Sequence, residues 1–453
     1  MNNFKFKPPS WKKVLSTEFF KKIISSKDLQ ILIQHAQKEY VHWDKFKHYK
    51  IPDGISPEEA WAYLKFTRMS NRETTPIESI QESKFTFNLT KSMYQKLSYI
   101  DSNASGYISA RLGKPDSKQK NQFILSSISE EAIASSQIEG ANTSRKVAKQ
   151  MILTNRMPKT RSEQMIINNY QVMQRLEEWK DLDLSLNMLI DIQKNITVNT
   201  LDDPKDSGRL RTDDDQIHVV DAATGISSYI PPKRAFVDKE IERLIAYAND
   251  DENEDNFVHP VIKASILHFW IGFLHPFVDG NGRTARAIFY WYLLKKNYWL
   301  FQYLSVSRII NKSKTEYSNA YLHSEYDEED LTYFLIYKLK VIYRAIDEFI
   351  EYLNKKIEEE NSLKLFASHL SELNERQVGL LHYFYKNPGK VTDVAIHQTK
   401  NLIVQQTASD DLKNLVKQGY LTRMKKGHKF VYVPNNTEIK KIVESVNEPK
   451  NNI

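Results

Sequence analysis

His275-Pro-Phe-Val-Asp-Gly-Asn-Gly-Arg-Thr-Ala-Arg286 is the stretch that organises this chain of 453 residues. An apolar segment precedes it and another follows, so we predict helices over about 260–274 and 282–296 with a short loop between them. Within twelve residues the stretch places one imidazole, one carboxylate, two glycines, an asparagine and two arginines. These are the groups needed to hold a nucleotide's phosphates beside a general base.

The glycines and arginines favour an anion site. Gly280 and Gly282 allow the backbone to approach a ligand at the start of the second helix, where free amides and the helix dipole attract negative charge. Arg283 and Arg286 are three residues apart and therefore share a helix face. Guanidinium groups match phosphate oxygens in pairs.

The remaining two side chains favour chemistry on a phosphate. Asp279 suits an anion site only if a cation lies between, and one carboxylate with phosphate oxygens is how Mg²⁺ is usually held. His275 has the intrinsic pKa to accept a hydroxyl proton near neutral pH. Taken singly, each residue has an ordinary structural explanation as a cap, a turn or a solvated charge. The combination favours function, and the sequence contains neither Gly-x-x-x-x-Gly-Lys-Ser/Thr nor Gly-x-Gly-x-x-Gly.

Composition is that of a soluble globular protein, with 41% hydrophobic and 27% charged residues and no cysteine. The absence of cysteine excludes disulfides, zinc-thiolate sites and a cysteine nucleophile. Residues 1–22 are lysine-rich without a continuous apolar core, and the apolar run 287–294 is too short to span a bilayer. We therefore expect a cytoplasmic protein that does not engage membranes.

The sequence pattern is mostly helical. Ser127-Ile-Ser-Glu130 matches a capping box, which predicts a helix from about Ser127 that Gly140 ends. One hairpin is clear, with strands over 216–220 and 226–230. Further helices are expected over 11–47, 57–70, 162–200, 236–249, 313–323 and 330–358, while 83–109 stays unassigned.

The motif resembles that of the Fic family, His-Pro-Phe-x-Asp/Glu-Gly-Asn-Gly-Arg-x-x-Arg, with every fixed position matched. The resemblance implies a mainly α, helical-bundle domain that transfers AMP from ATP to a Ser, Thr or Tyr hydroxyl of a target protein. The related Doc kinases carry Ala and Lys at the positions of Gly280 and Gly282, which disfavours that activity. A phosphocholine-transferring branch shares the core motif and stays open.

By this resemblance His275 is the base and Asp279 holds Mg²⁺. Gly280, Asn281, Gly282 and Arg283 are implied to seat the α- and β-phosphates. Arg286 is implied to seat the γ-phosphate, and Phe277 to anchor the loop in the core. The hairpin 216–230 resembles the family's flap, which pairs with a segment of the target protein by strand addition. Tyr317 is expected to flank the adenine, as is Tyr321.

Ser135-Ser-Gln-Ile-Glu139-Gly140 resembles the family's inhibitory motif, Ser/Thr-x-x-x-Glu-Gly/Asn. Ser135 and Glu139 are four residues apart on the predicted helix and share a face. The resemblance implies that Glu139 pairs with Arg286 and prevents ATP from taking a productive position. It also implies self-modification when the brake is released, and a second role for Glu139 in removing AMP from a modified target.

The C-terminal segment carries most of the excess positive charge. Residues 374–434 contain ten Lys and Arg against four Asp and Glu, whereas the whole chain has a net charge of +7. The pattern resembles a winged helix, with helices over 380–385, 391–399 and 407–417 and a hairpin whose tip is Lys425-Lys426-Gly427-His428-Lys429. Asp410 and Asp411 on the third helix oppose DNA binding, so a protein partner is the favoured alternative.

These observations predict five regions: an N-terminal helical region (1–105), a Fic-type catalytic domain (106–345), a connecting helix (346–372), a winged helix (373–434) and a polar tail (435–453). The predicted function is an autoinhibited protein adenylyltransferase, an enzyme that uses ATP and Mg²⁺. The alternative is a nucleotide-sensing, DNA-binding transcription regulator. The sequence leaves open whether the protein is a homo-oligomer.

Overall fold

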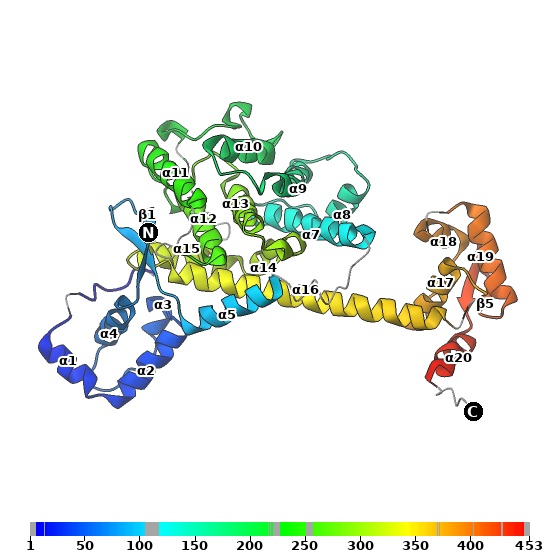
Figure 1. Ribbon diagram of the computed structural model, residues 1–453, viewed down its shortest axis with the longest axis horizontal. Coiled ribbons are helices and arrows are strands. Elements are labelled where there is room, and N and C mark those ends of the chain that lie inside the picture. Colours follow the sequence, from blue (N-terminus) through cyan, green and yellow to red (C-terminus); the bar gives the residue numbers. More distant parts are fainter. Residues whose placement is uncertain are drawn as a thin grey trace. The chain divides into compact units, whose positions relative to one another are not determined.

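The computed structural model describes residues 6–12, 14–104, 117–215, 217, 219–220, 227–250, 257–368, 370, 372–401, 403–426 and 429–447. Over these residues the fold is mainly helical, with three two-stranded antiparallel hairpins (Figure 1). The prediction of a mainly α protein is confirmed. The chain divides into two compact units, residues 1–349 and 350–453. The N-terminal helical region therefore belongs to the same unit as the motif.

The first unit begins with short helices around a core of their own. Ser16, Ser26 and Ser56 each accept a hydrogen bond from a first-turn amide, which fixes where three of these helices start. The helical prediction for this region is confirmed, and the apolar faces enclose a cluster that includes Phe46 and Trp61. The helices are α1 (Thr17–Ile24), α2 (Lys27–Lys38), α3 (Trp43–Phe46) and α4 (Pro57–Met69).

A hairpin that the sequence pattern did not predict follows. β1 (Glu73–Glu78) pairs with β2 (Lys84–Phe87), and a register irregularity lies between Thr74 and Glu78. The β-branched and aromatic residues of both strands were the available signal. α5 (Lys91–Ser102) comes next, in the stretch that the sequence left unassigned.

α7 (Ser117–Ile138) carries the predicted inhibitory motif, but its expected start was wrong. Ser127 lies inside the helix, because Ile124 and Ile128 continue the helical apolar spacing across it. Gly140, with φ of +94°, follows the helix end as predicted. The helix packs against α8 (Arg145–Leu153) and α9 (Arg161–Trp179), and these two are followed by α10 (Leu186–Thr197).

Two helices form the centre of the unit, α12 (Pro260–Leu274) and α13 (Asn281–Lys295), packed against each other (Figure 1). Thirteen of the fifteen residues in each are buried. Helices that are buried on almost all sides lie inside a domain rather than on its surface. The motif loop connects this pair, so the site is anchored to the most buried elements of the unit.

The other elements surround this pair. Ahead of it come η3 (Pro204–Asp206), η4 (Asp213–Asp215) and α11 (Arg234–Asn249), and after it η5 (Trp299–Tyr303), α14 (Val306–Lys312), α15 (Lys314–Tyr326) and α16 (Thr332–Ala367). The hairpin predicted as a flap is present as β3 (Val219–Val220) and β4 (Ser227–Tyr229), which pair antiparallel; that it binds a target stays a prediction. The residues expected to join these strands lie outside the described part of the chain.

The second unit holds helices and a hairpin in the predicted order: α17 (Glu375–Lys386), α18 (Val394–Asn401), α19 (Gln405–Lys417), β5 (Leu421–Lys426) and β6 (Lys429–Pro434). The expected connecting helix, 346–372, is the later part of α16. The prediction of a polar tail was wrong over α20 (Asn436–Asn447), because Ile439 and Ile442 are buried in the core of this unit. No helix in the described parts of the chain is long and apolar enough to cross a membrane.

Candidate active site

His275 lies where α12 ends, in the left-handed conformation with φ of 48° and ψ of 56°. Its backbone N–H donates to the carbonyl of Ile271 at 3.0 Å and so closes the helix. Non-glycine residues adopt this conformation uncommonly, so neighbouring groups must hold it. The ring Nδ1 lies 3.4 Å from the carbonyl of Gly272. With the proton on Nδ1, Nε2 is left as an acceptor.

Arg211 holds this turn, and the sequence pattern did not identify it as a site residue. Its Nε donates to the carbonyl of His275 at 2.7 Å, and its backbone N–H donates to the carbonyl of Pro276 at 2.9 Å. Only 4% of Arg211 is exposed. A second unpredicted brace is the buried Gln193, whose Nε2 donates to the carbonyl of Asp279 at 3.1 Å while its Oε1 accepts from the N–H of Gly208.

Asn281 braces the motif loop from inside. Its Oδ1 accepts from the backbone N–H of Phe277 and its Nδ2 donates to the carbonyl of the same residue, both at 2.8 Å. The side chain is therefore engaged by the loop, and any contact with a phosphate falls to its backbone N–H. Phe277 is buried, as the resemblance implied.

The N-terminus of α13 presents backbone amides to a ligand. Gly280 is its N-cap with φ of 87°, and a glycine offers these amides no side-chain cap. A Cβ at Gly280 would lie 3.0 Å from a methyl group of Thr197, so the position needs glycine for both conformation and space. Such an uncapped helix start is suited to an anion.

Arg283 is fully buried at this helix start. Its Nη1 donates to the carbonyl of Ile196 at 3.0 Å, and its Nη2 lies 3.3 Å from Oδ1 of Asp279. Burial lowers the pKa of Arg283, partly offset by the charge of Asp279. The Asp279 side chain is 40% exposed, so an ion has access to its carboxylate.

Arg286 and the inhibitory motif are in direct contact. Nε of Arg286 donates to Oγ of Ser135 at 2.7 Å, and Nη2 donates to the carbonyl of Ser135 at 3.0 Å. Nη2 also lies 2.8 Å from Oε1 of Glu139. Nη1 of Arg286 is buried without a hydrogen-bond partner. Nη1 of Arg286 is therefore a donor that a ligand could engage.

Glu139 also lies against the backbone of Gly282. A Cβ built on Gly282 would be 2.1 Å from Oε1 of Glu139 and 3.2 Å from Nη1 of Arg286. The carboxylate therefore occupies the start of α13, the position that suits a phosphate. A side chain larger than hydrogen at residue 282 has no room while Glu139 is there.

The electrostatics match this arrangement. Burial by itself raises the pKa of Glu139, but the positive charge of Arg286 outweighs it, and the pKa lies below its usual value. Burial lowers the pKa of His275, and its contact with Gly272 offsets this in part. Glu139 is therefore ionised and His275 neutral near pH 7.

Tyr317 lies beside this centre, with its hydroxyl 2.8 Å from Nε2 of His268. Nδ1 of His268 is 3.2 Å from Nζ of Lys338, and both of these side chains are fully buried. Tyr321 lies on the same face of α15, with its ring centroid 5.4 Å from that of Tyr317. Its hydroxyl packs against Gly272, where a built Cβ would lie 2.4 Å from the oxygen. That these tyrosines flank an adenine stays a prediction.

A cavity of about 430 Å³ opens next to the flap and α12. Its walls include Tyr229 of β4, Phe273, Phe85 and Glu325. The hydroxyl of Tyr229 donates to the carbonyl of Phe273 at 2.7 Å, which ties the flap to the residue two before His275. Burial raises the pKa of Glu325 to about 8.

Comparison with known proteins agrees with the geometry. Residues 183–293 match the model of the Fic/DOC family. The chain is 27% identical over 106 residues to protein adenylyltransferase fic-1 of Caenorhabditis elegans, covering 23% of this chain and 18% of that protein. It is 26% identical over 117 residues to protein adenylyltransferase Fic of Drosophila grimshawi, covering 26% and 22%. The chain thus spans about a fifth of the length of these relatives.

Solved structures are similar over longer stretches at low identity. A Fic family protein from Desulfovibrio desulfuricans is 17% identical with a TM-score of 0.48, covering 76% of this chain and 95% of that one. Fic-1 from C. elegans is 16% identical with a TM-score of 0.48, covering 73% and 86%. Residues 183–293 thus match the Fic/DOC family, and the chain is distantly similar to Fic protein adenylyltransferases over about a quarter of its length.

Proposed function

We propose that this protein transfers AMP from ATP to a hydroxyl of a target protein, and that Glu139 holds it in a low-activity state. The carrying observation is the Glu139 carboxylate, which pairs with Arg286 and lies against Gly282, at a helix start that suits a phosphate. The neutral imidazole of His275 stands at the other end of the same loop.

The proposed reaction needs little from the protein beyond positioning and one proton acceptor. The target's hydroxyl oxygen forms a bond to the α-phosphorus, and the bond from that phosphorus to the β-phosphate oxygen breaks. Nε2 of His275 takes the hydroxyl proton, and pyrophosphate leaves. Arg286 would hold the γ-phosphate through the donor that is now free and the one that Glu139 now occupies.

The donor set at the loop fits Mg²⁺. Asp279 offers a partly exposed carboxylate beside the phosphate site, and Mg²⁺ is commonly held by one or two carboxylates plus substrate phosphates. Bound there, the ion would neutralise charge that develops on the phosphates.

Removing the Glu139 side chain is expected to raise AMP transfer. Glu139→Gly frees Arg286 for ATP, and we expect a gain of roughly tenfold or more, the factor that ~1.4 kcal/mol of lost competition releases. His275→Ala in the same background should lower the rate by ~10²–10⁴, as loss of a general base does. Radiolabelled ATP and intact mass of the self-modified protein measure both effects.

Asn142→Gly, an exposed position three residues on, is the control. Equal activity of wild type, Glu139→Gly and the His275→Ala double variant would contradict the assignment.

Gly282→Ala separates relief of inhibition from loss of the phosphate site. The new Cβ would displace Glu139 but fill the same space, so ATP binding should be lost with or without Glu139→Gly. Calorimetric titration with ATP and Mg²⁺ measures this against Glu139→Gly alone. Gly379→Ala is the matched control, because a Cβ there meets nothing within 4 Å. Tight ATP binding by the double variant is the result that speaks against a phosphate at Gly282.

Mild acid should not release the brake. The pKa of Glu139 is lowered in the folded protein, so its ion pair persists above the ordinary carboxyl pKa and is lost only as the pH falls below about 4.5. The pKa of His275 is also lowered, so in Glu139→Gly the base stays neutral down to about pH 6.5, and activity falls only below that. Transfer rates between pH 5.5 and 8 at constant ionic strength test both statements. Wild type that turns active at pH 5.5 would be the contrary finding.

A second candidate function, duplex DNA binding by the second unit, gains support from one observation. Asp411, which the sequence placed against DNA on the third helix, is buried and paired with Arg376 at 2.8 Å. It also accepts from Asn374 and lies 3.2 Å from His397. Of the two aspartates that were expected to repel DNA, Asp411 therefore does not present its charge at the surface. Lys425 and Lys429 are exposed on the hairpin of β5 and β6.

We expect the full chain to bind a random-sequence duplex with an affinity that falls steeply with salt, because phosphate contacts release counterions. Lys425→Glu with Lys429→Glu should abolish binding and flatten the salt dependence. Fluorescence anisotropy between 50 and 200 mM salt measures it. Lys440→Glu with Lys441→Glu on α20 is the charge-matched control. No binding by wild type at the lowest salt removes this candidate.

A further inference from the structure

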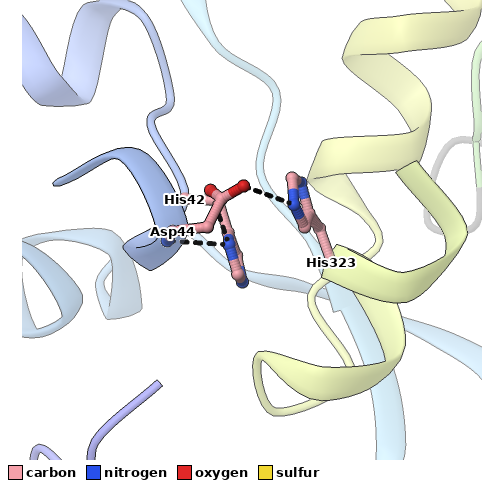
Figure 2. A group of neighbouring side chains, drawn as sticks. All are labelled: His42, Asp44 and His323. Atoms are coloured by element: carbon pink, nitrogen blue, oxygen red, sulfur yellow. Dashed lines mark hydrogen bonds and ion pairs between the residues drawn. The ribbon is translucent and has the colours of Figure 1, made fainter. Parts of the chain in front are cut away.

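Outside the active site, two imidazoles and a carboxylate converge between the N-terminal helices and α15 (Figure 2). His42 is the N-cap of α3, Asp44 follows two residues later, and His323 lies on α15. Nδ1 of His42 is 3.0 Å from Oδ1 of Asp44, and Nε2 of His323 is 3.3 Å from Oδ2. One donor atom from each residue lies within 4.8 Å of the others.

The three side chains are shielded from solvent, with exposures of 2%, 11% and 13%. Two further charged groups are close, but Lys65 and Asp327 form a buried ion pair at 2.8 Å. Among the described residues, the charged or polar side chains that contact the Asp44 carboxylate are therefore the two imidazoles.

Both imidazoles contact the Asp44 carboxylate. Nε2 of His323 is buried and pairs with Oδ2 of Asp44 at 3.3 Å, without a well-aligned hydrogen bond. Nδ1 of His42 lies 3.3 Å from the backbone nitrogen of Asp44 and 3.0 Å from its Oδ1. The two nitrogens and the carboxylate are the donor atoms that one cation would share.

We propose that His42, Asp44 and His323 bind one divalent metal ion of the borderline class, with Zn²⁺ as the reference, and that water fills the fourth position. Imidazole nitrogen and carboxylate oxygen are the ligands such ions take, at ~2.0–2.2 Å. Tetrahedral ligands at that distance are about 3.4 Å apart. The imidazole nitrogens now lie 3.0 and 3.3 Å from different oxygens of Asp44, so ligation requires one oxygen to approach both nitrogens. The imidazole rings are stacked 3.9 Å apart and 10° from parallel, so ligation requires them to turn until both nitrogens point at one ion.

The ion would join residues that are far apart in the chain. It would bind residues of α3, in the N-terminal helical region, and of α15, the helix that also carries Tyr317. Because a native-state metal site adds its binding free energy to stability, Zn²⁺ is expected to raise the melting temperature of the first unit.

The test uses tag-free full-length protein stripped with a chelator and titrated with Zn²⁺ alone by calorimetry. We expect one equivalent to bind the wild type, with a matching rise in melting temperature. His323→Gln and Asp44→Asn should each weaken binding by about tenfold or more, while His48→Gln, an exposed histidine nearby, should leave it unchanged. His42 is spared because it caps α3.

Equal uptake of Zn²⁺ by wild type, His323→Gln and Asp44→Asn overturns the proposal, since the ion would then lie elsewhere among the twelve histidines. Failure of the wild type to bind below about 100 µM overturns it as well, because that is no more than ~5.5 kcal/mol of affinity. Circular dichroism of each variant establishes that it is folded.

Discussion

The guanidinium of Arg286 is a full positive charge with 2% exposure, and the active centre is organised around satisfying it. Water contributes almost nothing there, so protein acceptors or a ligand must replace it. Ser135 of α7 supplies two acceptors, and Glu139, just after the end of that helix, supplies the negative charge. The same exclusion of water that makes an unpaired guanidinium costly strengthens its attraction for any anion at this point. Glu139 and a phosphate group would therefore compete for the same guanidinium.

Local sequence predicted the parts of the site that are encoded within a few residues. The twelve-residue motif placed the loop between α12 and α13, and the spacing of Ser135 and Glu139 placed both on the face that meets Arg286. Arg211 and Gln193 escaped prediction, because each contacts the loop across more than sixty residues of sequence. The sequence marks Arg211 and Gln193 only as polar residues in otherwise apolar or turn-rich segments. That pattern does not predict which backbone groups they bind, because the tertiary fold determines those contacts.

Errors in the fold prediction have the same origin. Ser127 has a capping pattern, yet α7 passes through it because packing on both sides continues. The residues after Pro434 are polar on average, yet α20 forms because two isoleucines find a core. Asp411 was expected to repel DNA, but a neighbouring helix supplies Arg376 and removes its charge from the surface. In each case the short pattern described the residues' own preferences correctly, but it did not predict the tertiary contacts that they make.

Glu139 also balances one charge that is not its direct partner. Arg283 is fully buried, and the negative charge of Glu139 partly offsets the lowering of the Arg283 pKa that burial causes. Replacing Glu139 with a neutral residue would remove the carboxylate that acts on both buried guanidinium groups. The proposed restraint on activity and the charge balance of this core therefore depend on one side chain.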